Sequence, residues 1–428
     1  MRFLYSFLVA LSTPFVLLYF AMRGIKDRTY LSRWGERFGW VQPGKRAGGI
    51  LLHAASMGEY NAASPLIRNM LKRYPELPLI VTTLTPTGSE RVSRELGDKV
   101  FHCYIPLDLP GAVKRFLNRT KPQLIIVMET EIWPNLYLEA HRRKTPMMIA
   151  NARLSKASVK HYQRFSGLAR DVLKPVLWVG AQSTVDAERM IQCGTNPQRT
   201  AMTGNLKFDL QVPASLLERG AALRNRWNPA RPVLVAGSTH EADESIILPA
   251  FTGLLKIIPD ALLILVPRHP ERFSSAAQAA RAAGLKVEMY SENEACSEQA
   301  QCFVIDTMGE LMTYYACADA TFVGGSMGEQ GGHNVLEPAA LGKPVMVGPN
   351  TANSKDIVAE LIDCGAAVRV SDQQGFQASA EDLLGDGVMR DQMGRAGLAL
   401  VERNRGALEL TLEAVDRQVS GFKYHSDA

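Results

Sequence analysis

The stretch Gly324–Pro349, GGSMGEQGGHNVLEPAALGKPVMVGP, decides the fold of the second half of the chain. It follows an apolar run at 320–323 that is typical of a buried strand, and it carries five glycines before a short helix expected at 334–342. Glycines let backbone N–H groups approach a ligand, and a helix N-terminus offers unpaired donors and a positive dipole to a phosphate. Four polar side chains share the stretch, namely Ser326, His333, Asn334 and Glu337. The combination predicts a nucleotide-binding loop, with an ordinary strand-to-helix connection capped by Asn334 as the alternative.

The composition describes an ordinary globular protein of two domains. A chain of 428 residues is too long for one hydrophobic core, and 46% hydrophobic with 21% charged residues excludes a disordered chain. A net charge of +5 is too small to indicate nucleic-acid binding, and no long block of Lys and Arg lies beyond the N-terminal region. The six cysteines are scattered without CxxC or zinc spacing, which indicates reduced thiols in a cytoplasmic compartment.

The N-terminal segment predicts a membrane anchor. Residues 3–22 carry no charged side chain, and the expected anchor, residues 1–22, is long enough to cross a bilayer. The cations Arg23, Lys26 and Arg28 follow it, so the positive-inside rule places the remaining chain in the cytoplasm. A signal peptide is the alternative, but the run is long for one and no small-residue cleavage site ends it. Pro14 interrupts a straight helix, so shallow insertion into one leaflet stays open.

Short apolar runs alternate with helical patterns after the anchor. This alternation predicts parallel sheets covered by helices, with ligands at the carboxyl ends of the strands. The last hundred or so residues are expected to be helical. Strands are expected at 49–53, 79–84, 124–128, 146–150, 178–182, 200–204, 233–236, 261–266, 286–289, 303–305, 320–323 and 344–347.

One segment interrupts the alternation. Residues 211–232 hold three prolines and an isolated helical patch at 215–226, and we expect them to link two domains. The first domain then covers 23–210 and the second 233–428, each a doubly wound α/β unit of the Rossmann type, with a cleft between them.

Carboxylates follow two strands of the first domain. Glu59 lies in SMGE, directly after the first strand, and Glu129 and Glu131 lie in METEIWPN, after the strand at 124–128. The pattern [ST]-x-x-E is also a helix capping box, so Glu59 has a structural alternative. Charges at strand ends can equally be solvated, but two carboxylates without a local cation are unusual strand residues. They are candidates for acid–base chemistry at the sheet edge.

Cations occupy comparable positions elsewhere. Arg268 ends a strand of the second domain between stiffening prolines and is suited to bind a phosphate, and Lys207 lies at the mouth of the linker. Both have the alternative of a solvated surface charge. No Asp-x-Asp motif occurs in the sequence, so the usual metal handle for a nucleotide-sugar diphosphate is missing. The sequence predicts no metal site and no cofactor.

Seven motifs of the sequence belong together: HAASMGE (53–59), METEIWPN (128–135), NARLS (151–155), GNLKFD (204–209), GSTH (237–240), PRHPERF (267–273) and GGHNVLEPAALGKP (331–344). With them, the sequence resembles the Kdo (3-deoxy-D-manno-octulosonic acid) transferases of lipopolysaccharide assembly. The likeness runs almost from end to end and includes the N-terminal anchor.

The resemblance implies a GT-B fold and an inverting transfer of Kdo from CMP-Kdo to a lipid A precursor, lipid IVA, at the cytoplasmic face of the bacterial inner membrane. It implies that Glu59 is the catalytic base, helped by Glu129 or Glu131 and by Lys207. CMP is a monophosphate leaving group, so N–H groups and cations can stabilise it without metal. The implied contacts to CMP are Arg268, His269, Met308, Gly309, Glu310, Leu311, Asn334, Val335, Leu336 and Glu337, to which the glycine loop adds Ser326.

Two other functions stay open at this point. A soluble sugar-nucleotide epimerase, or another transferase, can share the two-domain fold, because fold alone does not fix function. A membrane-tethered nucleotide-binding protein without activity needs the nucleotide loop but not Glu59. An epimerase needs neither an anchor nor a lipid acceptor, which separates it from the transferase.

Overall fold

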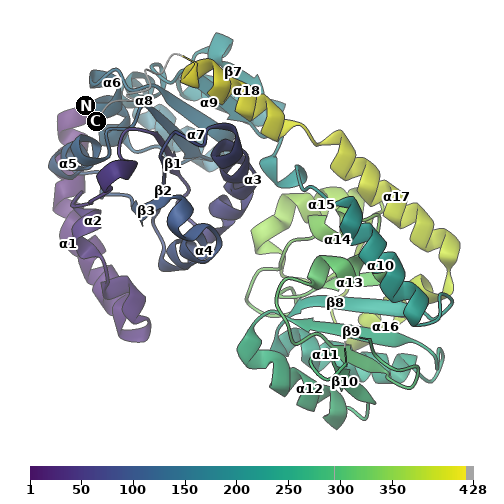
Figure 1. Ribbon diagram of the computed structural model, residues 1–428. Coiled ribbons are helices and arrows are strands. Elements are labelled where there is room, and N and C mark those ends of the chain that lie inside the picture. The colour runs from purple at the N-terminus through teal and green to yellow at the C-terminus, as the bar shows by residue number, and fades with distance from the viewer. Residues whose placement is uncertain (294, 421–428) are drawn as a thin grey trace. The chain divides into compact units, whose positions relative to one another are not determined.

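The computed structural model describes residues 1–293 and 295–420. Residue contacts divide the chain into two compact units, Met1–Asp209 with Asn404–Ala428, and Leu210–Arg403. Each unit contains a seven-stranded parallel sheet (Figure 1). Parallel sheets need both faces covered, which is why the strands read as continuous apolar runs.

The first sheet has the strand order β3-β2-β1-β4-β5-β6-β7, and the order reverses direction between β1 and β4. Its strands are β1 (Ile50–His53), β2 (Leu79–Thr83), β3 (Phe101–Tyr104), β4 (Leu124–Met128), β5 (Met147–Ala152), β6 (Trp178–Ala181) and β7 (Thr200–Met202). The helices of this unit are α1 (Arg2–Lys26), α2 (Trp34–Arg37), α3 (Met57–Arg73), α4 (Pro86–Leu96), α5 (Pro110–Thr120), α6 (Pro134–Arg142), α7 (Lys156–Arg164), α8 (Ser166–Leu173), α9 (Thr184–Cys193) and α18 (Ala407–Val419).

Alternate residues of the central strands supply two separate cores. Leu52 and Ile126 face a core completed by α3, α4 and α18, whereas Leu51 and Ile125 face a core completed by α5, α6, α8 and α9. This alternation follows from the period of two along a strand. Ser56 caps α3 by accepting the backbone N–H of Glu59, which begins the helix at the carboxyl end of β1.

The second sheet has the order β10-β11-β9-β8-β12-β13-β14 and reverses between β8 and β12. Its strands are β8 (Val233–Thr239), β9 (Leu262–Pro267), β10 (Val287–Met289), β11 (Cys302–Val304), β12 (Ala320–Val323), β13 (Val345–Val347) and β14 (Ala367–Arg369). The helices are α10 (Ala214–Arg226), α11 (Glu241–Leu254), α12 (Phe273–Ala282), α13 (Leu311–Cys317), α14 (Leu336–Ala340), α15 (Lys355–Asp363), α16 (Gln373–Gly385) and α17 (Gly387–Arg403). One face of the sheet packs on α11, α12 and α16.

Several expectations from the sequence differ from these boundaries. Edge strands β3 and β14 were not expected, and β14 interrupts the stretch predicted to be helical. Both are short and partly exposed, so they lack a strong apolar signal. Helix α14 covers only Leu336–Ala340, shorter than the expected 334–342.

The segment expected to link the domains is part of the second unit. Its helix α10 packs on α13, where Gly220 lies so close to Ala316 that an added Cβ would come within 2.6 Å of the Ala316 methyl group. The C-terminal helix α18 returns to the first unit, where it packs on α3 and β6 (Figure 1). The amphipathic pattern of a helix gives its apolar face but not the sheet that the face covers, so the sequence did not reveal this return.

Asp209 fixes the return of the chain to the first unit. Its carboxylate accepts the backbone N–H groups of Gly406 (2.7 Å) and Leu408 (2.8 Å) at the start of α18. Asp209→Ala should therefore cost the helix about 0.5–2 kcal/mol, the usual value of an N-terminal cap. We expect faster amide hydrogen exchange in α18.

The matched control is Asp372→Ala, which removes the cap of α16 in the second unit. It should speed exchange in α16 and leave α18 unchanged. Unaltered protection of α18 in the Asp209 variant would show that apolar packing alone holds the helix.

Candidate functional site

Three glutamates gather at the carboxyl edge of the first sheet, where the strand order reverses. Glu59 lies in the first turn of α3 after β1, and Glu129 and Glu131 lie in the loop after β4. The charges of Glu129 and Glu131 both raise the pKa of Glu59, which shows that the three side chains are neighbours. An edge where the strand order reverses is the usual ligand-binding position in such sheets.

Glu59 is both a helix cap and a perturbed acid. Its carboxylate accepts the N–H of Ala55 (2.8 Å) and the hydroxyl of Ser56 (3.2 Å). Burial raises its pKa to about 7, with Glu131 and Glu129 adding to the rise and the Ala55 hydrogen bond opposing it. The capping contacts expected as the structural alternative are therefore present. They coexist with a carboxyl group that titrates near neutral pH.

Glu131 behaves in the opposite way. Burial alone would raise its pKa, but contacts with His53 and Trp133 outweigh burial and lower it. The indole Nε1 of Trp133 donates to Glu131 (2.8 Å), and the His53 Nε2 lies 3.8 Å from the same carboxylate. His53 itself is fully buried and its Nδ1 lies 3.0 Å from the hydroxyl of Thr82. Adjacent carboxyls with divergent pKa values can divide the roles of acid and base.

Glu129 has a strained backbone and a cationic neighbourhood. Its φ is +52°, and its N–H donates to the carbonyl of Ala150 (2.9 Å). Burial raises its pKa, while the charges of Lys207 and Arg153 oppose the rise. Left-handed backbone at a non-glycine residue is costly and concentrates at functional sites. The effect of the Lys207 charge on Glu129 shows that Lys207 lies at the same edge as the glutamates.

Asn151 is a residue of this edge that the sequence did not single out as functional. It is buried, has a φ of +58°, and its Oδ1 accepts the N–H of Leu206 (2.9 Å). This bond fixes the 3-10 turn Leu206–Phe208, which carries Lys207. The only sequence signal was the presence of Asn151 in the motif NARLS.

In the second unit, one carboxylate orders the glycine loop. Asp243, at the start of α11, is fully buried and accepts the N–H groups of Gly325 (2.7 Å), Met327 (3.0 Å) and His240 (2.9 Å). Gly325 has a φ of +70°, and a Cβ there would come within 2.8 Å of the His333 ring. The loop after β12 is thereby tied to the loop after β8, at the reversal of the second sheet.

Imidazoles and a guanidinium cluster beside this loop. The Nε2 atoms of His240 and His333 lie 2.9 Å apart, and the ring of His269 lies edge-on to His240. Burial, together with the charge of Arg268, lowers the pKa of His333 to about 3. Burial also lowers the pKa of His240. One of the two facing nitrogens must donate, the lowered pKa values favour the uncharged form of the pair, and an anion placed beside it would favour protonation.

The predicted nucleotide contacts fall into two groups, those whose side chains reach the surface and those whose side chains are used within the protein. Arg268 and exposed His269 follow β9 beside the imidazole pair, Met308 is half exposed, and Asn334 is exposed and donates to Glu337 (3.2 Å). Other residues use their side chains within the protein. The Ser326 hydroxyl is buried and joins the Val323 carbonyl to the Gly348 N–H, and the side chains of Val335 and Leu336 belong to the core.

Of the remaining expected contacts, Glu310 lines a hollow of the second unit. Gly309 takes a φ of +97°, Glu310 forms an ion pair with Arg219, and Leu311 begins α13. The hollow is lined by Arg219, Ala222, Leu223, Arg226, Tyr290, Glu310 and Tyr314. Because α14 has little more than one turn, its dipole is weaker than the sequence suggested, and the glycine loop with its cations is the stronger anion site.

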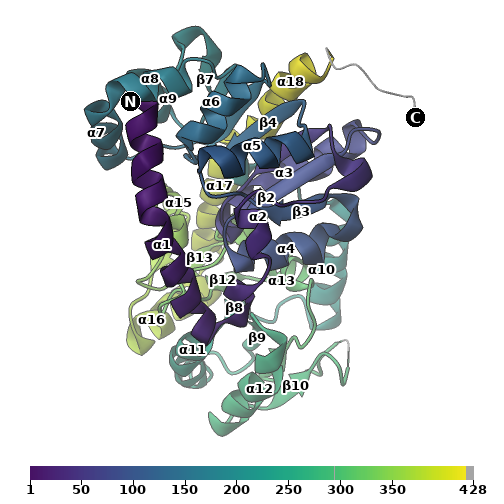
Figure 2. The ribbon, with the colours of Figure 1, turned by 90° about the vertical axis from the view of Figure 1, so that its left-hand side faces the viewer.

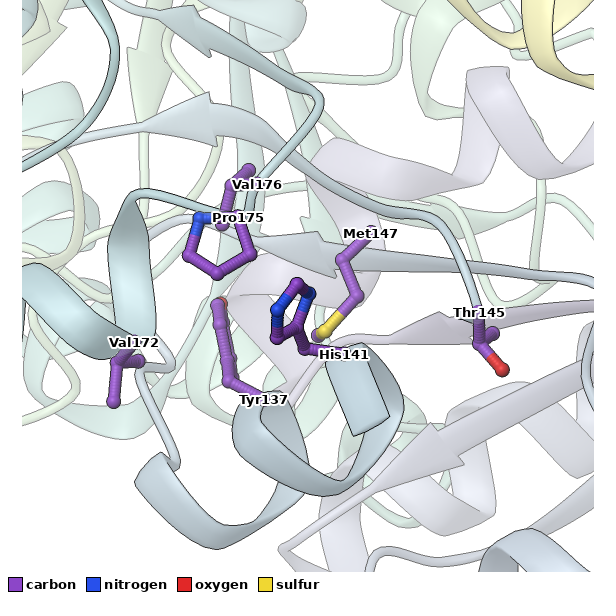
Figure 3. Close-up of a pocket in the computed structure, with 7 residues that line it drawn as sticks. All are labelled: Tyr137, His141, Thr145, Met147, Val172, Pro175 and Val176. Atoms are coloured by element: carbon purple, nitrogen blue, oxygen red, sulfur yellow. The ribbon is translucent and has the colours of Figure 1, made fainter. Parts of the chain in front are cut away.

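The first unit also has a small hollow. Figure 3 shows the rings of Tyr137 and His141 beside Pro175 and Met147. Met147 begins β5, so this hollow borders the amino ends of the strands, whereas ligands bind at the carboxyl ends. Among residues 1–293 and 295–420, no group of three or more His, Cys, Asp or Glu side chains is placed to hold a metal ion.

Comparison with known proteins first identifies the class of protein that the fold defines. Residues 250–399 match the family "Glycosyl transferases group 1". The fold resembles Anabaena HepE in complex with UDP (TM-score 0.54, 14% identity, covering 87% of this chain and 100% of that one). It equally resembles a UDP-GlcNAc 2-epimerase from Neisseria meningitidis (TM-score 0.53, 16% identity, covering 86% and 99%). The chain has the two-domain GT-B architecture, and the expected fold class is confirmed.

The sequence relatives then define the family. Residues 32–210 match the family described as "3-Deoxy-D-manno-octulosonic-acid transferase (kdotransferase)". The 3-deoxy-D-manno-octulosonic acid transferase of Haemophilus influenzae is 39% identical, covering 96% of this chain and 97% of that one. That of Bordetella pertussis is 36% identical over 90% of both chains. The chain belongs to the Kdo transferase family of glycosyltransferases, as its motifs indicated.

The raised pKa of Glu59 predicts a pH dependence that tests whether this residue acts as a general base. If Glu59 has that role it must be ionised, so kcat/KM should rise with pH through a midpoint near 7. Glu131→Gln removes a neighbouring negative charge and should move this midpoint to lower pH. The pH profiles of the wild type and the variant test both expectations.

Exposed Glu188 on α9 gives the control, since Glu188→Gln should leave the midpoint in place. A midpoint below pH 5 in the wild type would contradict a role of Glu59 as a base.

The stability of the fold should fall with pH where the activity rises. The neutral form of Glu59 is favoured in the folded state, so its contribution to stability is complete below its ordinary pKa and disappears as pH rises through 7.

Proposed function

We propose that the protein transfers Kdo from CMP-Kdo to a lipid A precursor, lipid IVA, with inversion and without a metal ion. The observation that carries the mechanism is the Glu59 carboxyl, which has a pKa of about 7 within the glutamate cluster of the first sheet. Membership of the Kdo transferase family supports the sugar. The donor, the acceptor and the roles of single residues are our proposal.

Glu59 is the proposed base. Inverting transfer needs a group that takes the proton of the acceptor hydroxyl as the new bond forms. A carboxylate with a pKa near the working pH combines a substantial ionised fraction with useful basicity, and general bases contribute about 10²–10⁴-fold. The Ala55 N–H and the Ser56 hydroxyl fix the carboxylate in place, so the capping contacts serve orientation.

The other residues of the first site balance charge. Glu131 stays ionised next to His53 and Trp133 and thereby keeps the pKa of Glu59 high. Lys207 neutralises Glu129 and provides a cation for an anionic substrate group, because Kdo is an acid. Asn151 acts as a positioning residue for the Lys207 turn. The first domain is therefore the proposed acceptor side.

The second domain is the proposed site of CMP-Kdo. Arg268, His269 and the pair of His240 and His333 surround a loop whose backbone glycines are ordered by Asp243. A phosphate bound there gains charge-assisted hydrogen bonds, and protonation of the imidazole pair would add positive charge as the phosphate leaves. Such donors can take the place of a metal ion for a monophosphate leaving group.

The N-terminal helix supports work on a lipid substrate. Arg2–Ile25 has a mean hydropathy of 1.9, and little of it is buried within the protein. The cations that follow favour an anionic membrane surface by about 1 kcal/mol each. We propose the inner membrane as the location, with the catalytic domains on its cytoplasmic side.

Glu59→Gln tests the mechanism. In an assay with CMP-Kdo and lipid IVA, read by mass spectrometry of the lipid product, we expect turnover to fall at least 100-fold because the base is lost. CMP affinity, measured by calorimetry, should stay unchanged.

An excess of EDTA should leave the wild-type rate unaltered. Loss of activity on chelation that magnesium restores would contradict the metal-free mechanism.

A matched variant separates the base from the cap. Asp186 occupies the same position of α9 that Glu59 occupies in α3, bonded to cap residue Ser183 and to the N–H of Leu154 (2.9 Å). Asp186→Asn therefore weakens an equivalent cap and should retain most of the activity. If Glu59→Gln kept more than about a tenth of the turnover, Glu59 would be a cap only.

Two variants test the nucleotide site. Arg268→Ala removes a charge-assisted donor, and Glu337→Ala removes an acceptor for ribose hydroxyls. Each should weaken CMP binding by about 1–3 kcal/mol in calorimetric titrations. Exposed Arg281 on α12 provides the control, since Arg281→Ala preserves the site. Unchanged affinity in both variants would place the nucleotide at another loop.

A further inference from the structure

The first turn of α1 is hydrogen-bonded to the first domain. The Tyr5 hydroxyl donates to Asp108 Oδ2 (2.9 Å), and the Ser6 hydroxyl donates to Asn135 Oδ1 (3.0 Å). Arg2 Nε donates to the same Asn135 oxygen (3.3 Å). Both acceptors are buried polar residues of the domain. The N-terminal end of the apolar helix is therefore attached to the first unit.

The acceptors are themselves firmly held. Asp108 accepts the backbone N–H groups of Asn135 (2.8 Å) and Leu136 (2.9 Å), and the Asn135 side chain donates to the Asp108 carbonyl (2.7 Å). Asp108 thereby caps the start of α6. Leaving such buried groups without a partner is costly, so these hydrogen bonds hold the start of α1 to the domain.

The other end of α1 is attached to the same domain. Phe20 is buried, and its ring packs against the guanidinium of Arg37 at 4.3 Å. Arg37 is fully buried and donates to the Leu84 carbonyl (3.2 Å). Gly24 lies in contact with Leu31, where the chain turns back towards the domain.

Figure 2 shows α1 as one long helix that begins at the N-terminus. Along its length, α1 exposes a continuous apolar stripe. Exposed fractions reach 89% at Phe3, 71% at Phe15 and 84% at Ile25. The half-buried or buried residues lie on the opposite stripe, at Tyr5, Ser6, Val9, Thr13, Val16, Leu17, Phe20, Ala21 and Gly24. The exposed stripe follows helical spacing and includes Phe3, Phe7, Leu11, Phe15, Leu18 and Met22.

These contacts exclude a helix that crosses the bilayer with the domain on one side. Residues 5 and 20 are about 22 Å apart along a helix, a large part of the roughly 30 Å hydrocarbon core. A spanning α1 would carry Asp108, Asn135 and the start of α6 through that core or to the far side. Exposing polar backbone and buried carboxyl groups to lipid is prohibitively costly.

We propose that α1 lies parallel to the membrane in one leaflet, with its exposed stripe in the acyl chains and both ends attached to the first domain. The proposal rests on the membrane attachment suggested above and adds its geometry. The depth expected for such a helix is about 5–10 Å below the headgroups. Arg23 and Arg28, at the C-terminal end, then lie at the level of anionic headgroups.

Depth measurements by spin labelling test the proposal. Single cysteines at 3, 7, 11, 15, 18 and 22 are labelled in a Cys364→Ser background, because Cys364 is exposed and the other five cysteines are buried. The full-length protein is placed in vesicles of phosphatidylethanolamine and phosphatidylglycerol. An in-plane helix gives one shallow, nearly constant depth at all six positions. A label at inward-facing Thr13 should show low accessibility to oxygen.

Other outcomes overturn the proposal. A depth profile that is deepest near residue 11 and returns to water at both ends would indicate a spanning helix. Absence of lipid contact at all six positions would mean that another surface, such as a second copy of the chain, covers the stripe. The measurement needs neither substrate nor turnover, so its result is independent of the proposed reaction.

A second measurement tests the N-terminal attachment itself. Tyr5→Phe with Ser6→Ala removes two hydrogen bonds to the domain without changing the apolar stripe. The label at residue 3 should become more mobile and move in depth, while the label at residue 22 should not change. Exposed Tyr19 gives the control variant Tyr19→Phe, which should leave both labels unaltered. Equal mobility at residue 3 in all three proteins would overturn the attachment.

Discussion

The reversal of strand order at the centre of each sheet is the constraint on which both candidate sites depend. Next to a reversal, the loops leaving the two central strands diverge, so that neither connecting helix closes the edge between them. In the first sheet this edge collects Glu59, Glu129 and Glu131, and in the second it collects the glycine loop and the imidazole pair. The same topology thus produces one acidic edge and one basic edge.

Placing several carboxyl groups at one edge carries an electrostatic cost that the fold distributes unevenly. Among the residues that the structure describes, Glu131 has an indole donor and His53, Glu129 has two cations, and Glu59 has only a backbone N–H and a hydroxyl. The group with the weakest support is therefore the one whose pKa rises to about 7. Pushing neighbouring pKa values apart in this way is a common means of obtaining a base that works at neutral pH.

The sequence predicted the central strands and the strand-end residues because both depend on local patterns. Apolar runs such as LIIVM at 124–128 identify buried strands, and polar residues that follow them must lie at the carboxyl edge. Contacts between distant segments have no such signal. The imidazoles of His240 and His333 are 93 residues apart, and α18 returns to the first unit over almost two hundred residues. The left-handed backbone of Asn151 and Ser238 was also hidden, since neither residue type requires it.

The attachment of α1 and the glutamate cluster share one set of contacts. Tyr5 bonds to Asp108, Asp108 caps α6, and the residue preceding that helix is Trp133, whose indole donates to Glu131. Each step is a buried or partly buried hydrogen bond or a rigid helix start, so the chain of contacts has little freedom. If α1 lies in one leaflet as proposed, the leaflet that fixes the height of α1 also fixes the height of the carboxyl edge. In the proposed reaction, the acceptor hydroxyl stands at a defined distance from the membrane because its lipid chains remain in the bilayer. The attachment would therefore present the proposed base, Glu59, at a constant height above the membrane.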